Sequence, residues 1–254
     1  MSQAITQFFQ TIGRVGLFTG DIAHGLTQRP YYWDEIVLNA TKVAYRCIVP
    51  VAAILFPTGM ISALMGLKIM ALFGTERMLS SLLAQGVVKE LAPSLAGIMI
   101  AAQAGSAIAG EIGTMRVKEE IDALGVMAVN PIKYLVIPRL IALAFICPLI
   151  SVVATASGMA GGFLVAIVLK GQNYGVFVAN LLNFVTLADI WSGLIKSSIF
   201  GLAVGLIACY YGYHVQGGAV GVGKAANNTV VHSIVAVAVL NYFLTVILMK
   251  VFVP

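Results

Sequence analysis

The sequence predicts an all-α, polytopic membrane protein with about five membrane-spanning helices. Of its 254 residues, 60% are hydrophobic and only 10% are charged, which leaves more apolar surface than a water-soluble domain of this length can bury. Several runs reach the roughly 20 residues that a helix needs to cross a hydrocarbon core of about 30 Å. Such runs are far longer than the alternating segments of a transmembrane barrel, so we expect helices.

The N-terminal part, residues 1–30, is expected to form an interfacial helix, because apolar residues recur there at helical spacing between glutamines and Arg14. A cytosolic helix packed on the protein is an equally open alternative. The aromatic cluster Tyr31, Tyr32 and Trp33 follows, and such clusters are typical of the headgroup level of a membrane. Charged residues interrupt this region, so we expect no cleavable signal peptide.

Five hydrophobic runs are predicted to span the membrane. The first contains Pro50 and Pro57, which remove backbone hydrogen bonds that neighbouring helices or a lined cavity must replace. The second carries small residues at every fourth position, a face that allows helices to approach closely. The predicted spans are residues 48–67, 84–110, 134–169, 190–213 and 229–250, and the small-residue face comprises Gly97, Ala101, Gly105 and Ala109. Five spans place the two ends of the chain on opposite sides of the membrane.

A charged segment between the second and third spans, which we call the island (Glu111–Pro131), holds four of the ten acidic residues. Charge is costly in hydrocarbon, so the island must lie in water beside the membrane. Val117, Ile121 and Leu124 share one helical face, which predicts an amphipathic helix over residues 114–126. This helix is either an ordinary solvated loop helix or a surface that a soluble partner reads.

The distribution of Lys and Arg indicates how the spans are oriented. Nine basic residues flank the spans on the island side, against six on the other side. Because basic residues are enriched in cytoplasmic loops, we expect a cytoplasmic N-terminus, a cytoplasmic island and a periplasmic C-terminus.

No pattern typical of a catalytic or metal site occurs. The sequence contains no HExxH motif, paired catalytic carboxylate or nucleophile elbow. The segment Gly218–Lys224 resembles the start of a phosphate-binding loop, but Ala225 replaces the magnesium-binding Ser or Thr, so we expect a glycine-rich loop between two spans. Cys47, Cys147 and Cys209 fit neither a disulfide framework nor a zinc site. We expect no enzyme activity, metal or cofactor in this chain, and the scattered basic residues argue against nucleic acid.

Lys89 and Glu90 form a charged pair directly before an uncharged run that begins near Pro93. They are either an interfacial pair that reaches into water or a charged lining for an amphipathic ligand. An ion-coupled transporter is disfavoured, because Glu90 and Asp189 are both expected near span ends rather than inside a span.

Two long blocks resemble the MlaE/YrbE permeases of bacterial lipid-transport ABC systems that work with MCE proteins. They are KELAPSLAGIMIAAQAGSAIAGEIGTMRVKEEIDALGVMAVNPIKYLVIPR, which begins at Lys89, and GGAVGVGKAANNTVVHS near the C-terminus. The resemblance implies a non-catalytic permease subunit in the bacterial cytoplasmic (inner) membrane. Such a subunit would move lipid, expected to be phospholipid, between this membrane and an MCE protein and would thereby serve outer-membrane lipid asymmetry.

The resemblance also implies several partners for this chain. A cytoplasmic ABC ATPase subunit would bind ATP and Mg, and a periplasmic MCE hexamer would receive or supply the lipid. A second permease copy is expected to complete a homodimer, and a small STAS-type cytoplasmic subunit is a further expected partner.

Site residues follow from the resemblance position by position. The island would be the coupling helix, and Lys89 and Glu90 would bind lipid. Gln103 replaces an Arg that many relatives carry and Asn130 replaces a common Asp, which leaves a headgroup role at position 103 open. The expected ATPase-coupling residues are Glu111, Arg116, Glu119, Glu120, Asp122 and Leu124, and the expected lipid-binding residues are Lys89, Glu90, Leu64, Leu67 and Gln103.

Two alternative functions remain open from the sequence. The chain is either a lipid permease or a passive membrane scaffold that anchors a lipid-binding MCE assembly, and a permease of this type could carry a sterol or fatty acid. The sequence leaves open the lipid, the direction of transport and the choice between homodimer and heterodimer.

Overall fold

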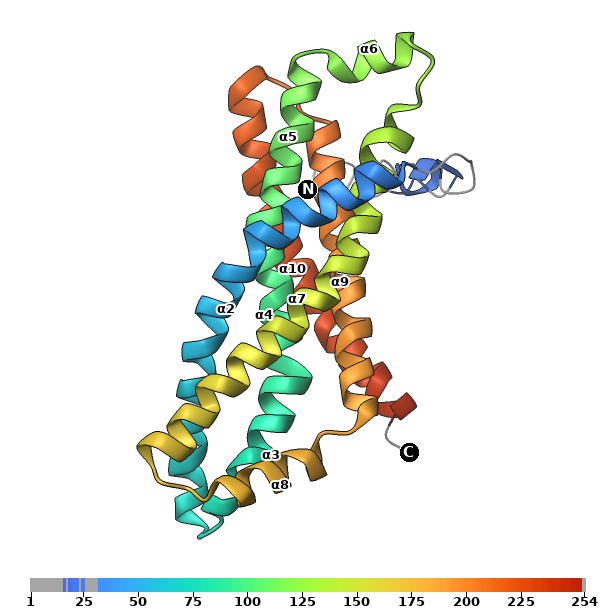
Figure 1. Cartoon of the computed structure of the whole chain (residues 1–254). Coiled ribbons are helices and arrows are strands. Elements are labelled where there is room, and N and C mark those ends of the chain that lie inside the picture. The colour runs from blue at the N-terminus through green and yellow to red at the C-terminus, as the bar shows by residue number, and fades with distance from the viewer. Residues whose placement is uncertain (1–15, 17, 23, 26–31, 253–254) are drawn as a thin grey trace, which may run out of the picture.

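The computed structural model describes residues 16, 18–22, 24–25 and 32–252, and this part of the chain forms a helical bundle (Figure 1). Among the described residues, five segments are long and apolar enough to cross a membrane, which confirms the predicted all-α, polytopic class. Each predicted span lies within one of these segments, which extend beyond it at one or both ends. The segments are Trp33–Leu72, Glu76–Val117, Ile132–Leu169, Leu187–Tyr213 and Gly218–Lys250.

Two of the five segments are not uniform α-helices, because π-helical stretches interrupt them. The second segment consists of η1 (Glu76–Met78), α3 (Leu79–Leu83), η2 (Ala84–Leu91), α4 (Ala92–Ile100), η3 (Ala101–Gly105) and α5 (Ser106–Val117). The third consists of η4 (Ile132–Val136), α7 (Ile137–Phe163) and η5 (Leu164–Leu169). The other spanning helices are α2 (Trp33–Leu72), α9 (Leu187–Tyr213) and α10 (Gly218–Phe252), and shorter helices α6 (Glu120–Val126) and α8 (Tyr174–Phe184) connect the segments. All stretches η2 to η5 are π-helical, and such stretches often occur at functional sites.

Helix α2 is much longer than the predicted first span and includes both prolines. Asp34 and Glu35 lie in its first turn, where their negative charge stabilises the positive end of the helix dipole. Its first part runs across the bundle and the rest runs along it (Figure 1). The predicted interfacial helix over residues 1–30 lies mostly outside the described residues, of which 16, 18–22 and 24–25 are helical.

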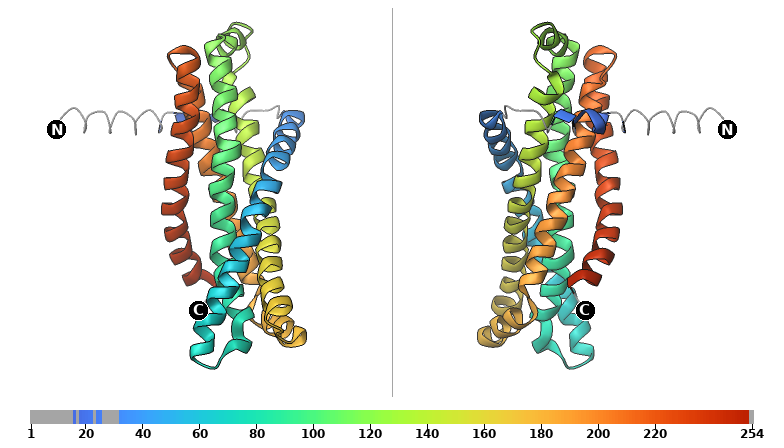
Figure 2. Two further views of the ribbon diagram at one scale, coloured as in Figure 1. Left: turned by 90° about the vertical axis from the view of Figure 1, so that its left-hand side faces the viewer. Right: turned by 90° about the vertical axis from the view of Figure 1, so that its right-hand side faces the viewer.

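Small residues allow α2 and α7 to pack backbone against backbone. A Cβ atom at Gly59 would overlap the carbonyl oxygen of Gly158, and one at Gly161 would overlap that of Phe56. Close approach of this kind favours association in lipid, where apolar burial provides little drive. Figure 2 shows α2 and α7 on one side of the bundle and α10 on the other, with the second segment between them.

The connections at the two ends of the bundle differ in character. α6 caps one end and α8 lies across the other (Figure 1). The connection between the third and fourth spanning segments contains an apolar helix, Tyr174–Phe184, which the sequence analysis does not predict. Asn173 starts it by accepting hydrogen bonds from the backbone N–H groups of Gly175 and Val176. Phe177 then packs into a core cluster with residues of α2 and α3.

The glycine-rich segment that was expected to be a loop is instead the beginning of α10. Gly217 and Gly218 have positive φ angles of 89° and 67°, so they form the turn after α9, and the chain is helical from Gly218 onward. Val222 of α10 lies beside Gly113 of the neighbouring helix α5. Tertiary packing of this kind outweighs the poor helix propensity of glycine.

Candidate functional site

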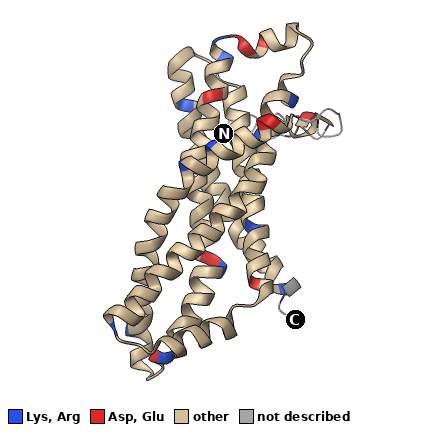
Figure 3. Cartoon of the chain, viewed as in Figure 1, with Lys and Arg blue, Asp and Glu red and all other residues tan. Residues whose placement is uncertain are grey.

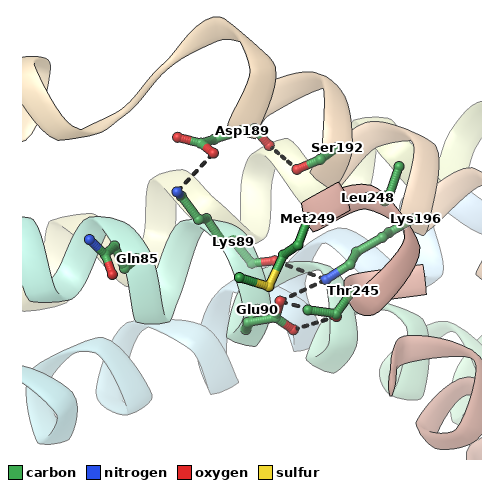
Figure 4. A pocket seen from close by; sticks show the side chains of 9 residues that line it. All are labelled: Gln85, Lys89, Glu90, Asp189, Ser192, Lys196, Thr245, Leu248 and Met249. Atoms are coloured by element: carbon green, nitrogen blue, oxygen red, sulfur yellow. Dashed lines mark hydrogen bonds and ion pairs between the residues drawn. The ribbon is translucent and has the colours of Figure 1, made fainter. Parts of the chain in front are cut away.

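Most charged residues lie toward the two ends of the bundle, but a small group lies inside it (Figure 3). This group surrounds a cavity of about 340 Å³, which we call the charged cavity, formed by η2, the first turns of α9 and the last turns of α10 (Figure 4). Its lining residues are Gln85, Lys89, Glu90, Asp189, Ser192, Lys196, Thr245, Leu248 and Met249.

Glu90 is the centre of a hydrogen-bonded group on the α10 side of the charged cavity. Lys196 Nζ lies 2.8 Å from Glu90 Oε1, and Lys196 is only 2% exposed. From α10, the Asn241 amide donates to Glu90 Oε2 at 3.2 Å and the Thr245 hydroxyl lies 3.2 Å from Oε1. A buried charge is stable only when it is paired and hydrogen-bonded, so Glu90 and Lys196 depend on each other.

Lys89 and Asp189 form a second ion pair on the side of the charged cavity away from α10 (Figure 4). Lys89 Nζ lies 2.8 Å from Asp189 Oδ1. The other oxygen of Asp189 accepts from the backbone N–H and the hydroxyl of Thr186, which makes a capping box at the start of α9. The lysine therefore joins η2 to a carboxylate that is already fixed by the helix terminus.

The π-helical stretch η2 places these two neighbouring residues inside the second segment. The sequence predicts that Glu90 lies near a span end, and in the structure it lies in η2, within the helical run Glu76–Val117. Lys89 extends toward α9 and Glu90 toward α10 (Figure 4). The two residues thus connect one stretch of the chain to two other helices.

An apolar cavity of about 230 Å³ lies beside the charged cavity and shares Asp189 with it. It lies between α7 and α9, next to Pro93 of α4. Its lining residues are Val88, Pro93, Ser151, Val152, Thr155, Ala156, Asp189, Ile190, Gly193 and Leu194. A polar chamber and an apolar chamber therefore meet at one carboxylate.

Three residues expected to bind lipid lie apart from the charged cavity. Leu64 is partly exposed on α2, and Leu67 is buried in the cluster around α3 and η5. Gln103 is exposed in η3. None of the three lines the cavity around Lys89 and Glu90.

The island does not form the single helix that the sequence predicts over residues 114–126. α5 continues from the membrane span to Val117, Glu119 takes a left-handed conformation with φ 61°, and α6 begins at Glu120. The break turns the chain so that Ile121 is buried against the bundle. Because the helix is broken here, Arg116 pairs with Asp122 at 2.6 Å, and Lys118 lies 3.9 Å from Glu120. In a continuous helix, each basic residue would instead lie beside the acid four positions later.

The island also contacts the end of α9. The Arg116 guanidinium lies 6.0 Å from the centre of the Tyr213 ring, in the range of a cation–π contact. Leu124 packs against the core, whereas Glu119 is exposed and Val126 and Met127 present apolar side chains to solvent. The outer surface of α6 therefore combines carboxylates with exposed apolar groups.

Glu111 lies at the inner end of the island and connects three helices. Its carboxylate is 3.4 Å from Arg46 of α2 and 3.7 Å from Arg139 of α7. Arg139 is buried and also donates to the Leu135 carbonyl, while its Nε has no partner. Glu111 therefore forms ion pairs within its own bundle. The resemblance implies a different role for it, in docking with the ATPase.

The small residues at four-residue spacing lie on the inner face of the second segment. Ala101 and Ala109 are fully buried. Gly97 lies against Phe200 of α9 and Val237 of α10, and Gly105 lies against Val204 of α9. A larger side chain at either glycine would push these helices apart.

Sequence comparison shows which known proteins this chain is similar to. The sequence model of the family described as Permease MlaE matches residues 36–247. The chain belongs to the MlaE permease family. It is 33% identical over 245 residues to a probable ABC transporter permease protein of Rickettsia typhi, covering 96% of this chain and 95% of the relative. It is 30% identical over 249 residues to the intermembrane phospholipid transport system permease protein MlaE of Haemophilus influenzae, covering 98% and 95%.

A plant protein is also similar to this MlaE-family chain. The protein TRIGALACTOSYLDIACYLGLYCEROL 1, chloroplastic, of Arabidopsis thaliana is 34% identical over 172 residues, which cover 68% of this chain and 49% of that protein. The similarity therefore extends beyond bacterial permeases.

Metal chemistry finds no support in the part of this MlaE-family chain that the structure describes. Within it, no group of three His, Cys, Asp or Glu side chains could hold a metal ion. Cys47, Cys147 and Cys209 are buried and free. His214 and His232 each lie against a carbonyl oxygen of their own helix, those of Tyr210 and Asn228.

Four members of the charged network were not identified from the sequence. Lys196 was counted among the flanking basic residues, although a single lysine within an apolar helix is itself a signal of a functional or paired site. Asp189 was recognised only as a residue near a span end. Asn241 and Thr245 gave no signal, because polar residues on an apolar helix acquire meaning only when the opposing carboxylate is known.

Proposed function

We propose that this chain is the transmembrane subunit of an ATP-driven phospholipid transporter and that the charged cavity receives the lipid headgroup. The observation that carries the proposal is the Glu90–Lys196 pair, two charges enclosed within a bundle of membrane-spanning segments. Buried charge in a membrane protein is costly and is a marker of a substrate path. The phospholipid-transport name of the Haemophilus influenzae relative supports the choice of substrate.

We further propose that the island faces the cytoplasm and that the bacterial inner membrane holds the bundle. Lys89 and Lys196 line the charged cavity and Arg139 is buried, so these three do not act as loop charges. Without them, eight basic residues remain on the island side against four on the other. This ratio favours a cytoplasmic island and N-terminus and a periplasmic C-terminus.

The outer surface of α6 is our candidate for docking a separate ATPase subunit that binds ATP and Mg. It presents Glu119, Glu120 and Asp122 together with exposed apolar Val126 and Met127. Such a mixed surface suits a polar, transient interface. Because Arg116 contacts Tyr213, motion of the island would reach α9, whose other end carries Asp189 and Lys196.

Other partners of this transporter remain proposals with weaker support. α10 exposes an apolar stripe that a second copy of the chain could cover in a homodimer; it comprises Val231, Val235, Val239, Tyr242 and Val246. The end that carries α8 would face the periplasmic MCE hexamer. A small STAS-type subunit would act on the cytoplasmic side, through the ATPase.

The test is lipid-stimulated ATP turnover in the complex assembled from this chain, its ATPase and the MCE protein. Replacing Glu119 and Glu120 by Lys reverses the charge of the α6 surface without touching the charged cavity. We expect the ATPase to bind more weakly and lipid stimulation to fall about tenfold or more, since like charges placed opposite each other at an interface cost several kcal/mol. The matched control reverses Asp34, an exposed carboxylate in the first turn of α2 and outside the α6 surface, and should leave stimulation intact.

The rival function is a passive scaffold for an MCE assembly. A scaffold would keep its assembly and show no lipid-stimulated turnover for the island change to remove. Turnover stimulated by a sterol or fatty acid but not by phospholipid would instead assign the chain to that substrate class. ATP hydrolysis by the purified chain alone would contradict the assignment of ATP chemistry to another subunit.

A further inference from the structure

We propose that the charged cavity selects a zwitterionic phospholipid with a primary ammonium group, of the phosphatidylethanolamine type, over a net anionic phospholipid. This inference rests on the proposed lipid-transport function and specifies the substrate of the same site. It depends on the way in which the charges of the cavity are already paired.

The charged cavity has no net charge to offer a ligand. Within the described part of the chain, four charged side chains line it, two basic and two acidic. Each base lies 2.8 Å from an acid, Lys89 from Asp189 and Lys196 from Glu90. A charged headgroup can therefore bind strongly only by replacing a partner in one of these pairs.

The two pairs differ in how easily a ligand could open them. Each pair has one enclosed and one partly exposed member: Lys196 and Glu90 are 3% and 38% exposed, and Lys89 and Asp189 are 32% and 11% exposed. A headgroup phosphate needs a cation that it can reach, and of the two lysines only Lys89 is accessible. Glu90 also receives further hydrogen bonds from α10. Lys89 and Asp189 also lie on the side of the cavity away from α10 (Figure 4). The Lys89–Asp189 pair is thus the one that a headgroup can enter.

A phosphate group alone would open this pair at a cost. The phosphate oxygens would take the Lys89 ammonium, and Asp189, only 8% exposed, would keep its Thr186 contacts but lose its cation. A buried charge left without its partner is strongly unfavourable. A net anionic lipid therefore binds Lys89 only against this penalty.

A zwitterionic headgroup avoids the penalty because it brings a replacement for each partner. Its phosphate pairs with Lys89 and its ammonium pairs with Asp189, so every charge remains paired after binding. Asp189 accepts an N–H hydrogen bond from Lys89 in the free cavity, and a primary ammonium can reproduce this bond. A quaternary ammonium has no N–H to donate and would form the weaker pair.

The test measures which lipid the purified chain retains. The chain is incorporated into nanodiscs that contain equal amounts of phosphatidylethanolamine, phosphatidylcholine and phosphatidylglycerol with matched acyl chains, and lipids bound to the released protein are quantified by native mass spectrometry. We expect phosphatidylethanolamine to exceed phosphatidylglycerol about tenfold, a modest value because the Lys89 pair is partly exposed.

Two variants move this ratio in opposite directions. Asp189→Asn keeps an oxygen that can accept from the backbone N–H of the N-cap residue Thr186 but frees Lys89, so binding of phosphatidylglycerol should rise about tenfold relative to phosphatidylethanolamine. Lys89→Gln leaves the carboxylate unpaired and should raise the preference for phosphatidylethanolamine. Glu76→Gln makes the same charge change as Asp189→Asn at an exposed position outside the cavity and should leave the ratio unchanged.

Each outcome tests either the headgroup preference or the proposed transport function on which it rests. Equal retention of phosphatidylethanolamine and phosphatidylglycerol by the unaltered chain overturns the inference and leaves phospholipid transport standing. Equal retention of phosphatidylcholine and phosphatidylethanolamine removes the requirement for an N–H donor. Should Asp189→Asn fail to fold, the Lys89→Gln ratio decides. Retention of no phospholipid, together with no transport by the assembled complex, would count against the proposed function itself.

Discussion

The ion pairs of the charged cavity and those of the island have the same chemistry in opposite surroundings. Lys196 and Glu90 lie 2.8 Å apart with 3% and 38% of their side chains exposed, whereas Arg116 and Asp122 lie 2.6 Å apart with 36% and 61% exposed. Water and salt weaken the second pair, while removing Glu90 from the first leaves the Lys196 ammonium enclosed by protein. Separation alone therefore does not rank these interactions, and burial does.

α9 is the element that both regions share. Asp189 and Lys196 lie in its first half. Tyr213, its last residue, contacts Arg116 of the island. A single stiff helix thus joins strongly coupled charges at one end to weakly coupled charges at the other. Because the island contacts rearrange easily, a small movement of the island can be passed to the end of α9. The stiff helix can then carry that movement to the charged cavity.

Glu90→Gln should produce the largest loss of stability, because it leaves the Lys196 ammonium buried without a counter-charge. We expect the free energy of unfolding in detergent micelles to fall by about 3 kcal/mol, within the range for breaking a buried pair. Gln keeps an oxygen that can accept from Asn241 and Thr245, so the loss reports the charge rather than the hydrogen bonds.

The double variant Glu90→Gln/Lys196→Met is the control that sharpens this result. It removes both charges, and replacing a buried pair by neutral side chains is often without cost, so stability should return to within about 1 kcal/mol of the original. Phospholipid transport by the assembled complex should remain lost. A double variant as unstable as the single one would show that packing, not charge, explains the effect.

The sequence predicts the number and type of the spanning segments because their apolar runs are long and uninterrupted. Their ends are less predictable, since α2 continues outward to Trp33 through residues that carry charge. α8 and the start of α10 were missed for a related reason. Asn173 as a helix cap and the contact of Val222 with Gly113 stabilise these helices, and only the first of these leaves a local signal in the sequence.

The candidate site is only half visible in the sequence. Lys89 and Glu90 stand out because they adjoin an apolar run, but their partners Asp189 and Lys196 are far away along the chain. Nothing in the spacing of these residues indicates which acid meets which base. The fold decides that pairing, and the π-helical turn of η2 lets adjacent residues reach different helices.

Glu111→Gln should have an intermediate effect, because its main partner is buried but the carboxylate is itself partly exposed. Arg139 would keep its bond to the Leu135 carbonyl and lose its counter-charge. We expect a loss of about 1 to 2 kcal/mol in the free energy of unfolding, less than for Glu90 because the separation is 3.7 Å and Glu111 faces solvent. Glu120→Gln, the same chemical change at an exposed pair, should cost much less. Equal losses for the two would remove the distinction between inner and outer island residues.

Arg116→Gln should have the smallest effect on stability and a larger one on coupling. Both members of its pair with Asp122 are substantially exposed, so its loss should change the free energy of unfolding by about 0.5 kcal/mol or less, and 0.5 M salt should reduce that difference further. The same change removes the cation above Tyr213, while the packing of Ile112 against Gly212 of α9 remains. Lipid-stimulated ATP turnover of the assembled complex should fall several-fold in this variant and recover in part with Arg116→Lys, which restores the cation without the planar guanidinium. A stability loss above about 1 kcal/mol would place Arg116 with the buried pairs, and unchanged turnover would remove the Arg116–Tyr213 contact as the route between the two regions.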